Sequence, residues 1–158
     1  MHFFKWLGIG IIFCCGILAG LFFAAFERQR LAQAEGFLSL LRHIRLQIDC
    51  FCTPISRILA ECDAEMLLAC GTRERPADLA ALLQGCRLYL SEDMCRLLGE
   101  LGGRLGGSYK DEQLRCLDYY IARLVPYCDA QRADLRKRER MALFLPPALS
   151  VALILLLW

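Results

Sequence analysis

The sequence is short of the residues and motifs on which most enzymes depend. It holds two histidines, His2 and His43, and no Cys-x-x-Cys pair despite its ten cysteines. The Gly-x-x-x-x-Gly-Lys-Ser/Thr loop that cradles nucleotide phosphates is absent, and no serine or cysteine stands in a recognised nucleophile signature. A P-loop ATPase is therefore excluded, and we expect no catalytic residue, no cofactor and no metal site.

Strand patterns and excess charge are also scarce. The chain has almost none of the β-branched alternation that is typical of strands, so an all-α fold is expected. Between residues 27 and 140 there are 18 basic and 17 acidic residues, which leaves a balance of +1. This near-neutrality gives no reason to expect a nucleic-acid partner.

Apolar residues, by contrast, are plentiful and concentrated at the two ends. Hydrophobic residues make up 57% of the chain, and residues 6–26 and 141–158 carry no charged side chain. A helix needs about 20 apolar residues to cross the hydrocarbon of a bilayer. Both runs are predicted to be transmembrane helices after a short tail at 1–5. The first is too long for a signal-peptide core and has no A-x-A cleavage site after it.

Basic residues near the two runs predict the orientation. The outer tails hold only Lys5, whereas Arg28 and Arg30 follow the first run. Five more basic residues precede the second run: Arg132, Arg136, Lys137, Arg138 and Arg140. The positive-inside rule then places residues 27–140 in the cytoplasm, and the scattered cysteines suit a reducing compartment. The five basic residues, which we call the basic cluster, are expected to meet anionic lipid head groups.

The segment between the two runs is predicted to form a series of helices. Apolar residues recur at helical spacing in a first helix that ends near Cys52: Phe37, Leu41, Ile44, Ile48 and Phe51. Thr53 and Pro54 are predicted to cap and open a second helix that Gly71 closes. Pro76 is expected to open a third helix that includes Leu90.

Two more helices are expected after Leu90. Ser91 is predicted to cap a fourth helix that ends in the glycine pairs of residues 102–107. Ser108 and Asp111 resemble a capping box at the start of a final helix, which is expected to bend at Pro126.

Two local patterns have both a functional and an ordinary interpretation. Gly16, Gly20 and Ala24 form a small-xxx-small series that would let the second run or a partner helix approach closely, although such triples also arise by chance. Cys50 and Cys52 are the nearest approach to a metal or redox pair. Two positions apart on a helix, they point about 200° away from each other, so buried apolar thiols are the preferred interpretation.

Two stretches carry a resemblance to a known family. Residues 41–55, LRHIRLQIDCFCTPI, and residues 101–113, LGGRLGGSYKDEQ, are similar to the stage III sporulation protein AB family. That family has a long first helix ending near a Thr-Pro-Leu turn, followed by an LG-x-x-LG-x-Ser-Asp-like junction. The matching positions here, which we call the family-motif residues, are Thr53, Pro54, Leu105, Gly106, Asp111 and Gln113. Tyr109 and Lys110 displace Asp111 from its usual place, and Pro146 and Pro147 replace the usual Leu-Gly of the last span.

The resemblance implies a fold, a function and a set of partners. The fold is an antiparallel helical bundle like that of the type II secretion platform protein, with transmembrane helices at both termini. The function is that of a non-enzymatic component of the channel apparatus that links mother cell and forespore. Its implied partners are sister membrane subunits and a cytoplasmic hexameric ATPase, while self-association stays open. A lipid-binding regulator acting through the basic cluster and a membrane thiol enzyme are the alternatives from other classes.

Overall fold

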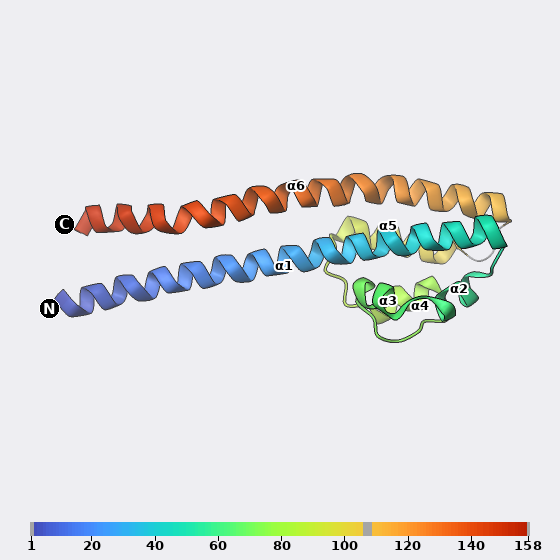
Figure 1. The fold of residues 1–158 in the computed structure, drawn as a ribbon, viewed down its shortest axis with the longest axis horizontal. Coiled ribbons are helices and arrows are strands. Elements are labelled where there is room, and N and C mark those ends of the chain that lie inside the picture. The colour runs from blue at the N-terminus through green and yellow to red at the C-terminus, as the bar shows by residue number, and fades with distance from the viewer. Residues whose placement is uncertain (1, 106–108, 158) are drawn as a thin grey trace. The chain divides into compact units, whose positions relative to one another are not determined.

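The chain is helical wherever its backbone is described. The computed structural model describes the backbone of residues 2–105 and 109–157; the side chains of most residues in 1–19 and of 139, 140 and 142–158 are outside it. Six helices follow in order: α1 (His2–Phe51), α2 (Ile55–Glu61), α3 (Ala64–Cys70), α4 (Leu79–Gly85), α5 (Glu92–Arg104) and α6 (Lys110–Leu157). No strand occurs among these residues, so the predicted all-α fold is confirmed (Figure 1).

The chain divides into two compact units. The first, here the core unit, comprises residues 29–130, and the second, here the end unit, comprises residues 1–28 and 131–158. Long helices α1 and α6 contribute to both units. The predicted spans, residues 6–26 and 141–158, lie mostly outside the residues whose side chains are described. Within the part that is described, no helix contains an apolar stretch long enough to cross a membrane.

Helices α1 and α6 run antiparallel in the core unit. Near the end of α1, the backbone oxygen of Asp49 accepts a hydrogen bond from Nζ of Lys110 at 2.6 Å. One turn earlier in α1, Arg45 donates to both carboxylate oxygens of Asp118, two turns further along α6. Residue numbers therefore fall along α1 in the direction in which they rise along α6, so the two helices are antiparallel.

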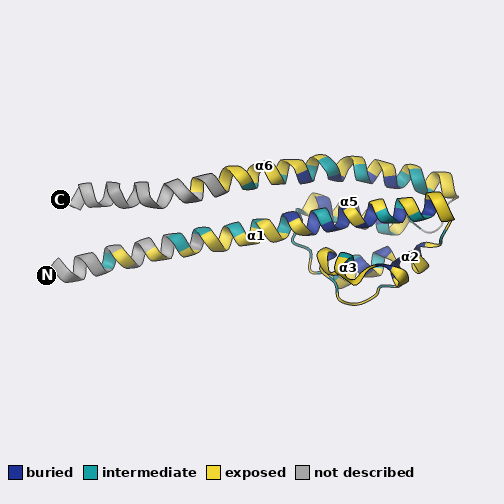
Figure 2. Cartoon of the chain, in the orientation of Figure 1, coloured by how far each residue is buried: buried dark blue, intermediate teal, exposed yellow. Residues whose placement is uncertain are grey.

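The core of this unit forms around α1 (Figure 2). Phe37, Leu41, Ile44 and Ile48 of the predicted stripe are all buried, but Phe51 is 70% exposed. Residues that flank this stripe on α1 are buried as well, notably Leu31, Ala34, Leu38 and Leu40. Leu117, Tyr120 and Leu124 of α6 are buried in the same core. The single stripe predicted for α1 was therefore too narrow, because α3 and its neighbours cover residues beside it.

Gln33 joins three segments of the core unit. Its side chain is 4% exposed, and its Nε2 donates to the backbone oxygens of Cys70 and Arg87, both at 2.9 Å. Its Oε1 accepts from the backbone nitrogen of Tyr89 at 2.7 Å. A buried amide that satisfies three backbone groups removes the cost of leaving them unpaired. Gln33 thereby fixes the end of α3 and the segment after α4 to α1.

Two glycines permit this arrangement. Gly71 ends α3 in the left-handed conformation, with φ of 99°, and a Cβ there would lie 2.8 Å from Nε2 of Gln33. Gly36 lies against α3, where a Cβ would come within 2.8 Å of the backbone carbonyl of Ala69. Both positions require the absence of a side chain, and the prediction that Gly71 closes a helix is confirmed.

The predicted start of the second helix was off by one residue. Helix α1 ends at Phe51, and Cys52 adopts φ of 51°, so the chain leaves the helix there. Pro54, not Thr53, occupies the N-cap position of α2, and no side chain caps that end. The segment up to Gly71 is also two helices rather than one, because Cys62 and Asp63 are both extended.

The third helix also differs from expectation, whereas the fourth agrees with it. Helix α4 begins after Asp78, whose carboxylate accepts from the backbone nitrogen of Ala81 at 2.6 Å, so Asp78 rather than Pro76 sets its start. Leu90 lies beyond its end. Helix α5 follows Ser91 and ends at Arg104, between the glycine pairs, as predicted. It includes Gly102, where a Cβ would meet the backbone of Ala80 at 3.3 Å. That glycine serves the contact between α5 and α4 rather than ending α5.

The final helix is a single element that includes Pro126. Helix α6 begins at Lys110 and continues past Pro126 without interruption. The proposed cap Ser108 lies outside the described residues.

The Arg45–Asp118 ion pair makes the stability of the core unit depend on acid and salt. Hydrogen bonding and charge from Arg45 hold the pKa of Asp118 below its ordinary value. The pair therefore stabilises the fold above the ordinary carboxyl pKa, and this contribution is lost as the pH falls through the lowered pKa. Both side chains are partly exposed, so the effect is small and screened by salt.

This ion pair yields a measurable expectation. Asp118→Asn should be less stable than wild type in urea unfolding near neutral pH and low salt, and the difference should vanish in acid. A difference that grew on acidification would contradict the assignment.

Candidate functional site

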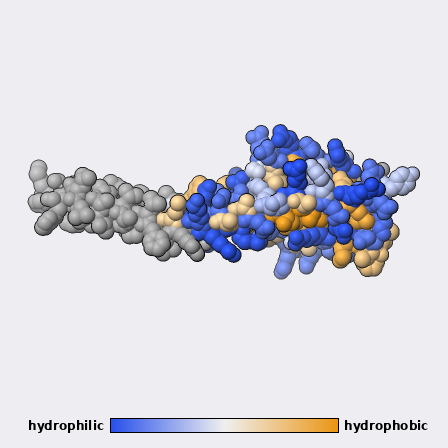
Figure 3. All heavy atoms as spheres, turned by 90° about the horizontal axis from the view of Figure 1, so that it is seen from above, coloured by the Kyte–Doolittle hydropathy of each residue, from blue (hydrophilic) through white to orange (hydrophobic). Residues whose placement is uncertain are grey.

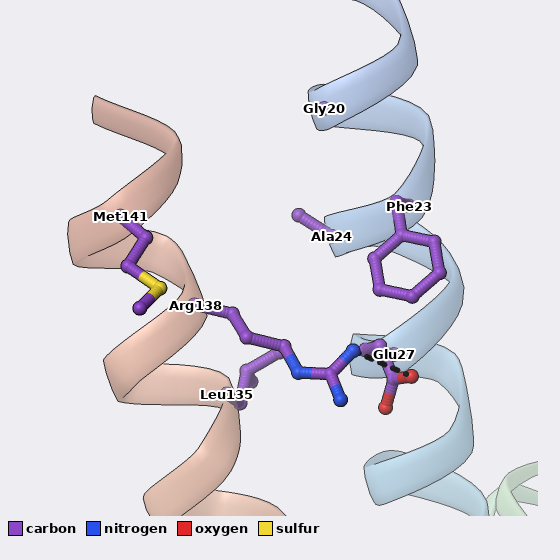
Figure 4. Close-up of a pocket in the computed structure, with 7 residues that line it drawn as sticks. All are labelled: Gly20, Phe23, Ala24, Glu27, Leu135, Arg138 and Met141. Carbon is purple, nitrogen blue, oxygen red and sulfur yellow. Dashed lines mark ion pairs between the residues drawn. The ribbon is translucent and has the colours of Figure 1, made fainter. Parts of the chain in front are cut away.

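Members of the small-residue series and of the basic cluster line the same cleft in the end unit. The cleft has a volume of about 330 Å³ and lies between α1 and α6 (Figure 4). Its lining residues are Gly20, Phe23, Ala24, Glu27, Leu135, Arg138 and Met141. Positions three and four apart share one face of a helix, so each helix presents one line of side chains to the cleft.

An ion pair closes one end of this cleft. Nη1 of Arg138 lies 3.5 Å from Oε1 of Glu27, and the Glu27 side chain is only 12% exposed. The guanidinium carbon of Arg138 lies 5.3 Å from the centroid of the Phe23 ring. Figure 4 shows the Arg138 side chain reaching from α6 toward Phe23 and Glu27 on α1. A carboxylate so little exposed needs a cationic partner, and an arginine over an aromatic ring adds a cation–π attraction. Arg138 therefore connects α6 to α1.

Two members of the small-residue series border this cleft. Gly20 and Ala24 both line the cleft and face α6. A Cβ at Gly20 would meet no atom within 4 Å, so the two helices are not in close contact at this point. The side-chain environment of Gly16 lies outside the described residues.

The basic cluster is divided between two roles. Arg132, Arg136, Lys137 and Arg138 are all exposed, while Arg140 lies outside the described side chains. Arg138 is paired with Glu27, so its charge is compensated within the protein. Arg136 and Lys137 remain on the surface, where an anionic head group can reach them.

The family-motif residues are only partly brought together. Thr53 and Pro54 connect α1 to α2, whereas Leu105 and Gln113 line a second hollow, in the core unit, of about 620 Å³. Asp111 lies in the first turn of α6 and is exposed, and Gly106 lies outside the described residues.

That second hollow contains the functional candidates that the sequence analysis missed. They are Arg104, Arg115, Tyr119 and Tyr120. A signal was present, because Arg115, Tyr119 and Arg123 recur at spacings of four along the final helix.

Burial holds five of the cysteines as protonated thiols. Burial raises the pKa of Cys70 to about 12, and burial also raises the pKa values of Cys62, Cys86, Cys95 and Cys116. A nucleophilic cysteine needs the opposite shift. Cys50 and Cys52, for which buried thiols were expected, are exposed, as is Cys14.

These differences predict the order in which the thiols react. Maleimide should modify Cys50 and Cys52 first, and Cys70 at least about 100-fold more slowly, because Cys70 is both protonated and inaccessible. Peptide mass spectrometry of samples quenched over time would measure the rates, with urea-unfolded protein as the reference. Equal rates for Cys50 and Cys70 in the folded protein would contradict the burial described here.

Among the described residues, no group of three or more His, Cys, Asp or Glu side chains is placed to hold a metal ion. No protein-family model, curated protein or solved structure matches this chain.

Proposed function

We propose that this chain is a non-enzymatic platform protein of a membrane complex, of the kind that links mother cell and forespore during endospore formation. The observation that supports the proposal is the division of the chain: both apolar ends belong to one unit, and a separate helical unit contains both stretches that resemble the sporulation family. A protein built this way holds an interaction domain at a membrane. The Glu27–Arg138 pair would keep the two anchoring helices together.

The proposal includes a place in the cell. Residues 6–26 and 141–158 would cross the cell membrane, with the core unit on the cytoplasmic side, in the mother cell. A membrane-impermeant maleimide tests this, because Cys50 and Cys52 are exposed on the core unit. They should be labelled only after the membrane is opened. Labelling of intact cells at these two thiols would contradict the orientation.

The function itself is tested by identifying what the protein holds. The tagged full chain would be crosslinked in an endospore-forming host, purified from detergent-solubilised membranes of sporulating cells, and analysed by mass spectrometry. Sister membrane subunits and a hexameric cytoplasmic ATPase are expected. Recovery of this protein alone, with lipids, would contradict the platform role.

The exposed basic residues favour one second candidate, a lipid-binding regulator. Each Lys or Arg near an anionic surface contributes about 1 kcal/mol to membrane binding. Under this candidate, reversing Arg132, Arg136 and Lys137 to glutamate would weaken binding of phosphatidylglycerol head groups by more than about tenfold. Reversing Arg42, Arg73 and Arg96, which are exposed in the core unit, makes the same change in net charge and serves as the control. Unchanged lipid binding in the first variant would eliminate this candidate.

A further inference from the structure

The hollow of the core unit lies where α5 ends and α6 begins. Its volume is about 620 Å³, and its described lining consists of Arg104, Leu105, Glu112, Gln113, Arg115, Cys116, Tyr119 and Tyr120. It is lined by both polar and apolar surface, unlike the cleft of the end unit. Figure 3 shows the same mixture on a larger scale, with apolar areas set among polar ones on the described surface.

The charge of this hollow is positive. Glu112 is the one acid among its described lining residues, against Arg104 and Arg115. Burial raises the pKa values of Cys116 and Tyr120, and the charge of Arg104 opposes both shifts, which locates this guanidinium beside the hollow.

Further charged groups surround the lining, and among them the carboxylate of Glu100 also acts on Tyr120. Nε of Arg115 donates to the backbone oxygen of Asp111 at 3.3 Å, a neutral group that does not compensate its charge. The nearby carboxylate of Asp118 is bound by Arg45 on α1.

Aromatic side chains accompany these arginines. Tyr119 is 53% exposed, and its ring meets that of buried Tyr120 edge to face, with 5.3 Å between centroids. The guanidinium carbon of Arg123 lies 5.4 Å from the Tyr119 centroid, which adds a third cation at the rim. Tyrosine and arginine are the residues that most often dominate binding energy at protein interfaces. Their presence in one hollow is typical of a recognition site.

We infer that this hollow binds an acidic segment of a partner protein. Carboxylates of the segment would pair with the guanidinium groups of Arg104 and Arg115, which suit bidentate contacts, and an apolar side chain would lie against Leu105 and Tyr119. A concave site does not present its charges to a flat bilayer, so a protein segment fits better than a lipid surface. The inference rests on the proposed platform role, because it names the chemistry of one docked partner.

Peptide binding to the full chain in detergent tests the inference. The probe is a short fluorescein-labelled peptide with glutamates around one phenylalanine, and the comparison peptide has lysines in place of the glutamates. Fluorescence anisotropy should show saturable binding of the acidic peptide alone. Arg104→Gln/Arg115→Gln should weaken it by about 10- to 100-fold, while Arg42→Gln/Arg73→Gln, with the same loss of charge elsewhere, should change it less than about threefold.

Two further variants separate recognition from general charge. Tyr119→Ala should weaken the acidic peptide by about tenfold without changing net charge. Arg104→Lys/Arg115→Lys should restore part of the lost affinity, since charge returns without the bidentate geometry. Far-UV circular dichroism melts of each variant check that the fold is retained.

Three results would overturn the inference. They are an absence of acidic-peptide binding, equal losses in the two double-glutamine variants, and loss of phosphatidylglycerol vesicle binding rather than peptide binding in Arg104→Gln/Arg115→Gln. The crosslinking experiment on sporulating cells tests the platform role independently of the peptide assay. A complex that is recovered intact beside a failed peptide assay removes this inference and leaves the platform role. Peptide binding without any recovered complex removes the platform role and leaves the acidic-peptide site.

Discussion

Gln33→Leu is expected to destabilise the folded protein by about 3–4 kcal/mol. Leucine fills a similar volume but can neither donate to the oxygens of Cys70 and Arg87 nor accept from the nitrogen of Tyr89. Each backbone group left unpaired in a protein interior costs about 1–3 kcal/mol, and relaxation toward water recovers part of that loss. The substitution therefore acts through three backbone groups at once.

Urea unfolding of the full chain in detergent, followed by circular dichroism, would measure this loss. Gln84→Leu is the matched control, because Gln84 is exposed on α4, and it should change the stability by less than about 0.5 kcal/mol. Gln33→Glu should be at least as harmful as the leucine variant, since a carboxylate would face two carbonyl oxygens. If Gln33→Glu were harmless, the hydrogen-bonding account would be wrong and Gln33 would act by volume alone.

The second large effect is expected at Gly36. A Cβ there would come within 2.8 Å of the backbone carbonyl of Ala69 and 2.9 Å of its Cβ, so Gly36→Ala forces α1 and α3 apart. Backbone atoms cannot move aside as a flexible side chain can. We expect a loss of about 2–4 kcal/mol, in the range of other overpacked positions.

Gly99 provides a control of opposite sign. It lies in α5, is exposed, and a Cβ there would meet no atom within 4 Å. Gly99→Ala should therefore stabilise the protein by up to about 1 kcal/mol, because alanine is the better helix former. The same urea unfolding assay compares both variants. Destabilisation of similar size at Gly36 and Gly99 would show that helix propensity and the close contact are not the deciding factors.

The sequence predicted the elements of this fold better than their boundaries. Periodic apolar residues identified α1 and α6, and Gly71 marked a helix end, because these signals are local. The breaks at Cys62 and Asp63 had no such signal, since neither residue is a strong helix breaker. The role of Gly102 was also hidden, because it depends on contact with Ala80 in another helix.

The candidate sites were predictable to a lesser extent. The basic cluster and the small-residue series can be recognised from residue spacing alone. The pairing of Arg138 with Glu27 cannot, because these residues lie far apart in the chain. Gln33 was overlooked although it stands four positions before Phe37, on the same face as the apolar stripe. A single polar residue on such a face indicates a buried hydrogen-bonding group. The hollow at Arg104 and Arg115 required the structure, because separate helices contribute its walls.

The bond from Tyr89 to Gln33 also bears on how the core unit opens. Tyr89 lies between α4 and α5, outside any helix, yet its amide proton is held by a buried side chain rather than by water. Amide hydrogen exchange at Tyr89 should therefore be slower than at amides in the same connecting segments that are bound only by water. The stretch from Gly71 to Tyr89 would then separate from α1 as one cooperative unit when the hydrogen bonds of Gln33 break.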